Sequence, residues 1–150
     1  MIVPVTLENI TEAARIHSIS WQESHRSFCS EDFINLHNVE HQQKYISEKI
    51  ANGSKFYLLI DQEPVAVVSV TDSLIEDLYV LPEYQNRGYG SQLLDYVVTI
   101  IKDQDLTPTL WILENNDGAK RLYLRKGFVA SGNVNAITDK LDEIEFTLQV

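Results

Sequence analysis

The segment Gln85-Asn86-Arg87-Gly88-Tyr89-Gly90 has the residue types of a phosphate-binding turn. It follows an apolar, strand-like run, Leu78-Tyr79-Val80-Leu81, and leads into a helical pattern that begins at Ser91. Glycines at alternate positions remove the Cβ atoms that would hold a backbone away from a ligand. The first N–H groups of a helix have no acceptor within the helix, and the helix dipole makes their surroundings positive. The segment therefore predicts an anion-binding turn, although a glycine pair alone also occurs in turns without a ligand.

A second segment, about thirty residues downstream, could supply a proton donor. It reads Asn116-Asp117-Gly118-Ala119-Lys120-Arg121-Leu122-Tyr123-Leu124-Arg125-Lys126-Gly127-Phe128 and follows an apolar strand-like run around Trp111. Ala119 and Tyr123 are four residues apart and so share one face of a helix. Gly127 stands where a glycine commonly ends a helix. The pattern predicts a short helix that carries a tyrosine on its apolar face.

Together these segments, from Leu74 to Phe128, resemble the GNAT superfamily of acyl-CoA N-acyltransferases. The first is similar to the family's pyrophosphate motif, Q/R-x-x-G-x-G/A, and the second to its N-x-x-A-x-x-x-Y-x-x-x-G-F motif. The resemblance implies an N-acetyltransferase that uses acetyl-CoA, without a metal, and acetylates a primary amine of a small molecule or peptide by direct attack in a ternary complex. The alternative left open is a non-catalytic acyl-CoA-binding sensor or regulatory protein.

The resemblance also assigns residues to the cofactor. In the family, the strands before and after the glycine-loop helix splay apart, and the pantetheine arm pairs with the first of them as an added strand would. The contacts implied here are Leu78, Tyr79, Val80, Gln85, Asn86, Arg87, Gly88, Tyr89, Gly90, Ser91, Asn116 and Lys126. Asn116 also suits the N-cap of the second helix.

Tyr123 and Glu76 are the candidates for proton transfer. The amine must lose a proton before it attacks, and the departing thiolate gains one. The resemblance assigns the second step to Tyr123, whose alternative role is packing; a phenol with a pKa of about 10 is protonated at neutral pH. A position that often holds the family's base is Leu74 here. Glu76, two residues along the same strand face, becomes the candidate base, directly or through water, and Asp77 is expected to point the other way.

The candidate acceptor-binding residues follow the first predicted helix. By the resemblance this region lines the acceptor site, where Trp21 and Phe28 could stack on a substrate and Glu23 or His25 could hold an amine. Trp21 could instead seal the core. The chain has 22 acidic and 12 basic residues and a net charge of −10, which favours a cationic acceptor.

Hydrophobic periodicity predicts a mixed α/β (α+β) chain. Helical spacing covers 7–22, 39–51 and the stripe from Leu93 to Ile101, and strand-like runs cover 2–5, 56–60, 65–70, 74–80, 128–130 and 144–150, the last two joined by a polar connection. With the resemblance, this implies a central sheet of six to seven strands, antiparallel in front and splayed at the acyl-CoA site, with about four helices. No repeat or linker interrupts residues 1–150, so one domain is expected.

Composition excludes several function classes. The acidic balance argues against nucleic-acid binding, which requires a basic face. No run is long and apolar enough for a membrane span, and the start of the chain lacks the features of a signal peptide. Cys29 is the only cysteine, so neither an intrachain disulfide nor a cysteine zinc cluster can form. The expected location is cytoplasmic, and a homodimer is left open.

Overall fold

The computed structural model describes residues 1–27 and 29–149. The predicted contact Phe28 therefore lies outside the described residues. In chain order the elements are β1 (Ile2–Pro4), α1 (Ile10–His25), α2 (Glu31–Leu36), α3 (Val39–Ala51), β2 (Lys55–Asp61), β3 (Glu63–Thr71), β4 (Leu74–Val80), the 3-10 turn η1 (Pro82–Tyr84), α4 (Tyr89–Lys102), β5 (Thr109–Leu113), α5 (Asp117–Arg125), β6 (Phe128–Thr138) and β7 (Leu141–Leu148).

The seven strands form one sheet in the order β1-β2-β3-β4-β5-β7-β6. All neighbours pair antiparallel except β4 and β5, which pair parallel. The predicted mixed sheet with an antiparallel front half is confirmed. Within the described residues there are five α-helices, because a short helix, α2, lies between the two that the periodicity indicated.

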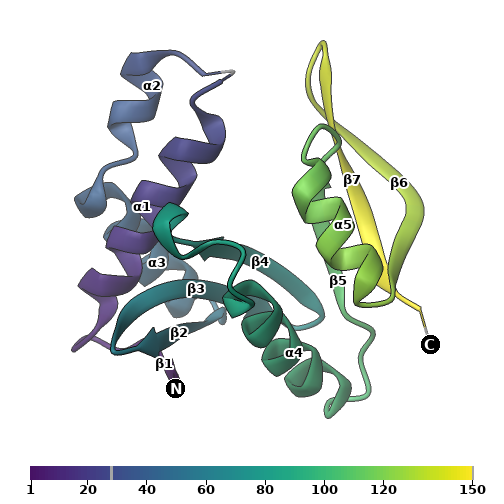
Figure 1. Ribbon diagram of the computed structural model, residues 1–150, viewed down its shortest axis with the longest axis horizontal. Helices are drawn as coiled ribbons and strands as arrows, with labels where there is room; N and C mark the ends of the chain where they lie inside the picture. The colour runs from purple at the N-terminus through teal and green to yellow at the C-terminus, as the bar shows by residue number, and fades with distance from the viewer. Residues whose placement is uncertain (28, 150) are drawn as a thin grey trace.

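Helices cover both faces of this sheet because the strand side chains alternate between two cores. Tyr57 and Leu59 of β2 belong to the core beneath α4 and α5, whereas Phe56 and Leu58 belong to the core beneath α1 and α3. The apolar run of β3 is buried on both sides for the same reason. In Figure 1, α4 lies over the teal strands and α5 over the green and yellow strands.

The apolar stripe of α4 fixes the helix that follows the glycine loop. Leu93, Leu94, Val97 and Ile101 are fully buried against the sheet. Burying one such side chain stabilises a fold by roughly 1.5–3 kcal/mol relative to leaving it exposed. The stripe therefore holds the first turn of α4 at a defined place above the end of β4.

The helix α2 and most of β6 were not predicted, since only residues 128–130 of β6 were expected as a strand. Ser30 caps α2 by accepting a hydrogen bond from the Phe33 N–H at 3.3 Å, and acidic residues follow in the first turn, which is a recognisable start signal. The predicted polar connection after residue 130 is wrong, because β6 continues to Thr138 and pairs with β7. Almost every residue of β6 is exposed, so this strand lacks the apolar alternation by which a half-buried strand is recognised.

Over the described ranges 1–27 and 29–149, none of the helices combines the length and apolarity that a membrane crossing requires.

Candidate active site

Strands β4 and β5 part after a short stretch of pairing. They share only two parallel pairs, Leu74 with Thr109 and Ile75 with Leu110. Beyond Ile75, β4 runs on to Val80 with pairing on its β3 side. The two halves of the sheet diverge visibly from this point (Figure 1). Within residues 1–27 and 29–149, one edge of β4 beyond Ile75 is therefore not paired with a strand.

The unpaired edge is formed by the backbone groups of Leu78 and Val80. The Leu81 N–H donates to the Val65 carbonyl at 3.0 Å, so residue 81 faces β3. In an extended strand, successive residues present their N–H and C=O groups to opposite edges. Tyr79 therefore also faces β3, while Leu78 and Val80 face the opening. The Val80 carbonyl has side-chain partners instead of a strand: it accepts hydrogen bonds from the Gln85 amide at 3.1 Å and the Ser20 hydroxyl at 3.4 Å.

The glycine loop leads directly from this opening into α4. Gly88 is the N-cap of the helix in a left-handed conformation, with φ of 86°, and no side chain caps the helix. A Cβ at Gly88 would meet no atom within 4 Å, so the glycine is required there by backbone conformation and not by packing. The first N–H groups of α4 consequently have no partner within the helix. This arrangement suits an anion.

The side chains around the loop hold it in place. The Arg87 guanidinium lies 5.4 Å from the centre of the Tyr84 ring, and the Tyr89 hydroxyl donates to Asp61 at 2.5 Å. The hydrogen bond to Asp61 raises the pKa of Tyr89. A surface hollow of about 380 Å³ adjoins the loop, lined by Asp61, Gln62, Glu63, Tyr84, Arg87 and Tyr89.

The two sequence motifs meet at the end of β4. A Cβ built at Gly90 would lie 3.6 Å from a Val80 methyl group and 3.9 Å from Leu122 of α5. Asn116 caps α5, accepting from the Ala119 N–H at 3.1 Å. Lys126 reaches across to Asp95 of α4, with Nζ and Oδ2 3.0 Å apart. The start of α4, the end of β4 and α5 therefore form one unit.

Tyr123 lies inside this unit. Its side chain is buried in the core shared with α4, and its ring meets Phe128 edge to face at 5.8 Å between centroids. Burial raises the pKa of Tyr123, so the phenol stays protonated at neutral pH. Tyr123 is also one of the groups that raise the pKa of Tyr79, after burial and Asp77. The helix therefore brings a protonated hydroxyl group close to β4.

A β-bulge interrupts β4. Because of it, the prediction that Asp77 points to the face opposite Glu76 is wrong. Ser69 of β3 pairs with Glu76 and Val67 pairs with Tyr79, so two β4 residues, Asp77 and Leu78, oppose one residue of β3. Asp77 has φ of 55° and is the extra residue. Its side chain consequently points to the same face as that of Glu76, not to the opposite one. Simple alternation failed because it cannot include a bulge.

The Asp77 carboxylate lies at the centre of a buried polar cluster. Oδ1 accepts from His17 Nε2 at 2.8 Å, and Oδ2 accepts from Ser69 Oγ at 2.8 Å and Lys49 Nζ at 3.3 Å. The Tyr45 hydroxyl lies 3.2 Å from both oxygens. Burial alone would raise the pKa of Asp77, but His17, Lys49 and Ser69 together lower it. Burial and the Asp77 charge raise the pKa of Tyr45 to about 12.

Glu76, the candidate base, is paired at the rim of this cluster. Its carboxylate lies 2.7 Å from Lys49 Nζ and keeps 41% of its side chain exposed, against 9% for Asp77. Burial would lower the pKa of Lys49, yet Asp77 and Glu76 outweigh it and raise that pKa. Lys49 is therefore a fixed positive charge between two carboxylates, of which only Glu76 is accessible.

The predicted acceptor residues on α1 have other partners. Trp21 stacks on His25 at 4.0 Å and 11° and on His37 at 3.5 Å and 14°. Two imidazoles this close and this parallel must cover opposite faces of the indole. Contrary to the prediction, Trp21 has no free face on which an acceptor could stack. Glu23 is exposed, with an oxygen 3.6 Å from Arg26.

His25, the other predicted acceptor residue of this region, is one of the two imidazoles stacked on Trp21. Its Nδ1 lies 2.8 Å from the Trp21 carbonyl oxygen. Burial lowers the pKa of His25, although the hydrogen bond to Trp21 opposes the change. The neutral imidazole is therefore favoured, and a neutral imidazole can contact an amine through a hydrogen bond, whereas an imidazolium would repel a cationic one.

These features match a known family. The model of the acetyltransferase (GNAT) family matches residues 14–128, a span that includes the bulge, the glycine loop and Tyr123. The chain belongs to the GNAT acetyltransferase family. Among curated proteins, a search found no match to the sequence.

Solved structures share the fold of this GNAT protein. The PaiA N-acetyltransferase from Thermoplasma acidophilum, in complex with coenzyme A, aligns over 100% of this chain and 98% of its own, with a TM-score of 0.75 and 19% identity. The ribosomal-protein-alanine N-acetyltransferase from Brucella melitensis aligns over 100% and 99%, with a TM-score of 0.75 and 13% identity. A streptothricin acetyltransferase from Bacillus anthracis, in complex with acetyl coenzyme A, aligns over 65% and 63%, with a TM-score of 0.58 and 21% identity.

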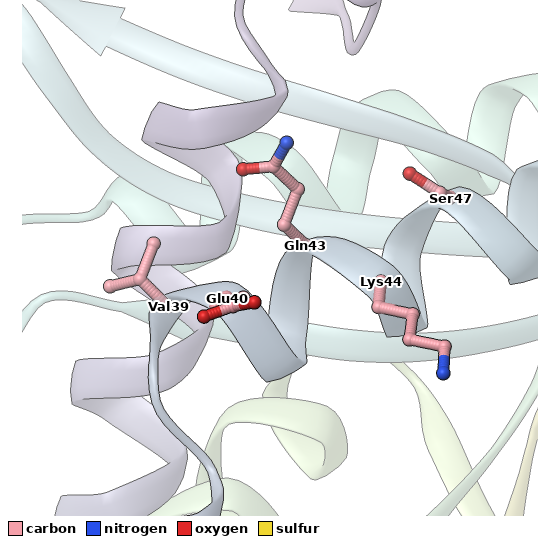
Figure 2. Close-up of a pocket in the computed structure, with 5 residues that line it drawn as sticks. All are labelled: Val39, Glu40, Gln43, Lys44 and Ser47. Carbon is pink, nitrogen blue, oxygen red and sulfur yellow. The ribbon is translucent and has the colours of Figure 1, made fainter.

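A second surface hollow of this GNAT protein, larger than the one at the glycine loop, lies elsewhere. It measures about 610 Å³ and is lined by Val39, Glu40, Gln43, Lys44 and Ser47. Figure 2 shows that all five side chains come from one helix, α3. Because the lining residues all belong to α3, a ligand in this hollow would be contacted by one helix only. None of these residues belongs to the site at β4.

Sequence reasoning missed the groups around Asp77. His17, Tyr45, Lys49 and Ser69 come from three elements, and no local pattern connects them. One signal was present: aspartate is disfavoured in a strand, so an aspartate inside an apolar strand run can mark a bulge.

No group of three or more metal-ligating side chains was found among residues 1–27 and 29–149.

Proposed function

We propose that residues 1–150 form a single N-acetyltransferase domain that transfers the acetyl group of acetyl-CoA to a primary amine. The observation that carries this proposal is the parting of β4 from β5 beside a glycine loop and Tyr123. Two proteins of the same fold were crystallised with coenzyme A or acetyl coenzyme A, which supports the choice of co-substrate.

The cofactor is placed by backbone groups. Its pyrophosphate lies at the start of α4, against the N–H groups of the loop that Gly88 ends. The pantetheine arm runs along the unpaired edge of β4 and pairs with Leu78 and Val80. Asn116 and Lys126, the cap residues at the two ends of α5, supply the further contacts of this proposal.

The chemistry is direct attack of the amine nitrogen on the thioester carbonyl carbon. The Leu78 N–H donates to the carbonyl oxygen as negative charge develops there. The C–S bond then breaks, and the thiolate takes the proton of the Tyr123 hydroxyl. A cationic amine gives one proton to Glu76 through water before it attacks, because Glu76 is the accessible carboxylate of the cluster. The nitrogen loses a second proton to water as the amide forms, and Tyr123 takes a proton back from water.

We expect the best acceptors to be cationic amines, because acidic residues outnumber basic ones by 22 to 12. A negative field concentrates cations at a cleft and speeds their encounter. A panel of amines, scored by release of free CoA thiol, should contain acceptors whose kcat/KM falls several-fold between low salt and about 1 M salt, where the Debye length is about 3 Å.

The same panel separates the proposed enzyme from an acyl-CoA sensor. A neutral analogue of the best amine, with the same carbon skeleton, serves as the control and should show little salt dependence. Tight binding of acetyl-CoA without thiol release on any amine would contradict the enzyme and support the sensor. Preference for neutral or anionic acceptors at every salt concentration would contradict the charge argument alone.

We also propose that the protein forms a homodimer through β6. This edge strand carries no charged residue from Phe128 to Thr138, although the chain as a whole has a net charge of −10. Val134 and Ile137 are 55% and 48% exposed. An unpaired edge strand readily pairs with another chain, and a neutral edge is where two acidic copies repel least.

Charge placed on β6 should therefore dissociate the dimer. We expect Val134→Lys combined with Ile137→Lys to weaken dimerisation at least about tenfold, because like charges would face each other across the twofold axis. Sedimentation equilibrium gives the constant. Leu7→Lys is the matched control, since Leu7 is 92% exposed before α1 and away from β6. A wild-type protein that stays monomeric at high concentration, or a double variant that dimerises like wild type, would contradict the proposal.

A further inference from the structure

Asp77 combines two costly features at one position. A left-handed φ is disfavoured for residues with a Cβ, although less for aspartate than for most, and the turn residue of such bulges is commonly glycine. A buried carboxylate loses its hydration and requires partners. Asp72 has a left-handed φ as well, but it is exposed, and among the described residues only at Asp77 does such a φ coincide with a side chain that is 9% exposed. A glycine would form the bulge more easily, so the carboxylate itself needs an explanation.

The carboxylate ties the bulge to its surroundings. His17 comes from α1, Tyr45 and Lys49 come from α3, and Ser69 comes from the neighbouring strand β3. The side chains of His17 and Asp77 are only 3% and 9% exposed, so these contacts are shielded from water. The position of β4 is thereby fixed relative to both helices on this face.

The bulge decides which backbone groups face the opening. Before it, Glu76 pairs with Ser69 and faces β3; after it, Tyr79 pairs with Val67 and faces β3. If Asp77 were instead paired as in a regular strand, with no bulge, alternation would turn Leu78 and Val80 toward β3 and leave Tyr79 at the open edge. The side chains would also exchange faces: Leu78 now packs toward α4 and Tyr79 toward α1.

We propose that Asp77 is a positioning residue for acetyl transfer: through His17, Tyr45, Lys49 and Ser69 it holds the β4 bulge that aims the Leu78 N–H at the thioester carbonyl. The inference rests on the proposed function, since it assigns a role within the same site. Asp77 does not touch the substrate. It acts through the backbone of the next residue.

The test compares two aspartates of the same hairpin. Asp77→Gly keeps the left-handed conformation easy but removes the carboxylate. Asp72→Gly is the matched control, because Asp72 also has a left-handed φ, 53°, yet is exposed and has no part in the cluster. Active sites are counted by CoA titration, so that kcat refers to folded protein. We expect Asp77→Gly to lower kcat on the order of a hundredfold, which is the effect of losing one oxyanion donor. The KM for acetyl-CoA should stay within about threefold of the wild-type value. Asp72→Gly should keep the wild-type kcat.

Milder changes keep the test decisive if Asp77→Gly does not fold. Ser69→Ala removes one hydrogen bond to Asp77 and should lower kcat several-fold in the same direction. Asp77→Asn keeps the shape and part of the hydrogen bonding, so its kcat should lie between those of Asp77→Gly and wild type. A kcat per active site within twofold of wild type in Asp77→Asn and Ser69→Ala would overturn the proposal. So would a loss confined to KM.

An infrared measurement separates this inference from the proposed function. Acetyl-CoA labelled with carbon-13 at the carbonyl should show a lower carbonyl stretching frequency when bound to wild type, because the oxygen accepts the Leu78 N–H. In an Asp77 variant the frequency should return toward its value in solution. This readout needs binding but no turnover, so it holds even if no amine is acetylated. An unchanged frequency in the variant would overturn the role of Asp77 alone.

Discussion

Tyr123→Phe should lower kcat on the order of a hundredfold, the scale of losing a general acid, and leave the affinity for acetyl-CoA close to that of wild type. The phenylalanine ring keeps the edge-to-face contact with Phe128 and the packing beneath α4. Only the hydroxyl proton is lost, so the departing thiolate must take its proton from water. Steady-state kinetics, with the thiol released as product, measures the change.

The pH profile adds a second check on Tyr123. Burial raises its pKa above the ordinary value of about 10, so the neutral phenol persists at alkaline pH. No loss of kcat through ionisation of Tyr123 is therefore expected between pH 7 and about pH 10, and Tyr123→Phe should lower the whole profile without shifting it. Tyr96→Phe on α4 is the control, because Tyr96 is 38% exposed. Full activity of Tyr123→Phe would show that Tyr123 is not the general acid and serves only in packing.

Local sequence patterns predicted the parts of the site that depend on local geometry. A glycine at φ of 86° before a helix, an asparagine N-cap and a tyrosine one turn from Ala119 each follow from a few adjacent residues. The parting of β4 and β5 was implied only by the resemblance. It depends on two strands separated by a helix, and no short pattern encodes where their pairing stops.

The cluster at Asp77 shows what the sequence could not provide. Strand alternation placed Asp77 on the opposite face from Glu76, whereas one extra residue in β4 reverses every position after it. The partners His17 and Lys49 lie 60 and 28 residues away in the chain, so their meeting follows from the packing of α1 and α3 on the sheet. Similarly, Trp21 is a plausible stacking surface by type, but His25 and His37 cover both of its faces.

Gly88→Val should abolish most of the stabilisation that acetyl-CoA gives to the wild-type protein. A ligand that binds only the folded state stabilises it by about 2.7 kcal/mol at a hundredfold excess over Kd. For a chain of this length that corresponds to a rise in Tm of roughly 5–10 °C. Valine at φ of 86° carries a backbone cost of about 1–2 kcal/mol, so the loop relaxes away from the conformation that presents its N–H groups.

Two other glycines make this result interpretable. Gly53→Val carries the same kind of cost, because Gly53 has φ of 104° with no atom within 4 Å of an added Cβ, but it follows α3 and should keep the full shift. Gly90→Ala should also keep it, since its Cβ would make ordinary contacts with Val80 and Leu122. Thermal melts of the three variants with and without acetyl-CoA give the comparison. If Gly88→Val melts with the wild-type shift, the pyrophosphate does not bind at this loop; if Gly53→Val loses the shift equally, backbone strain rather than the site explains the loss.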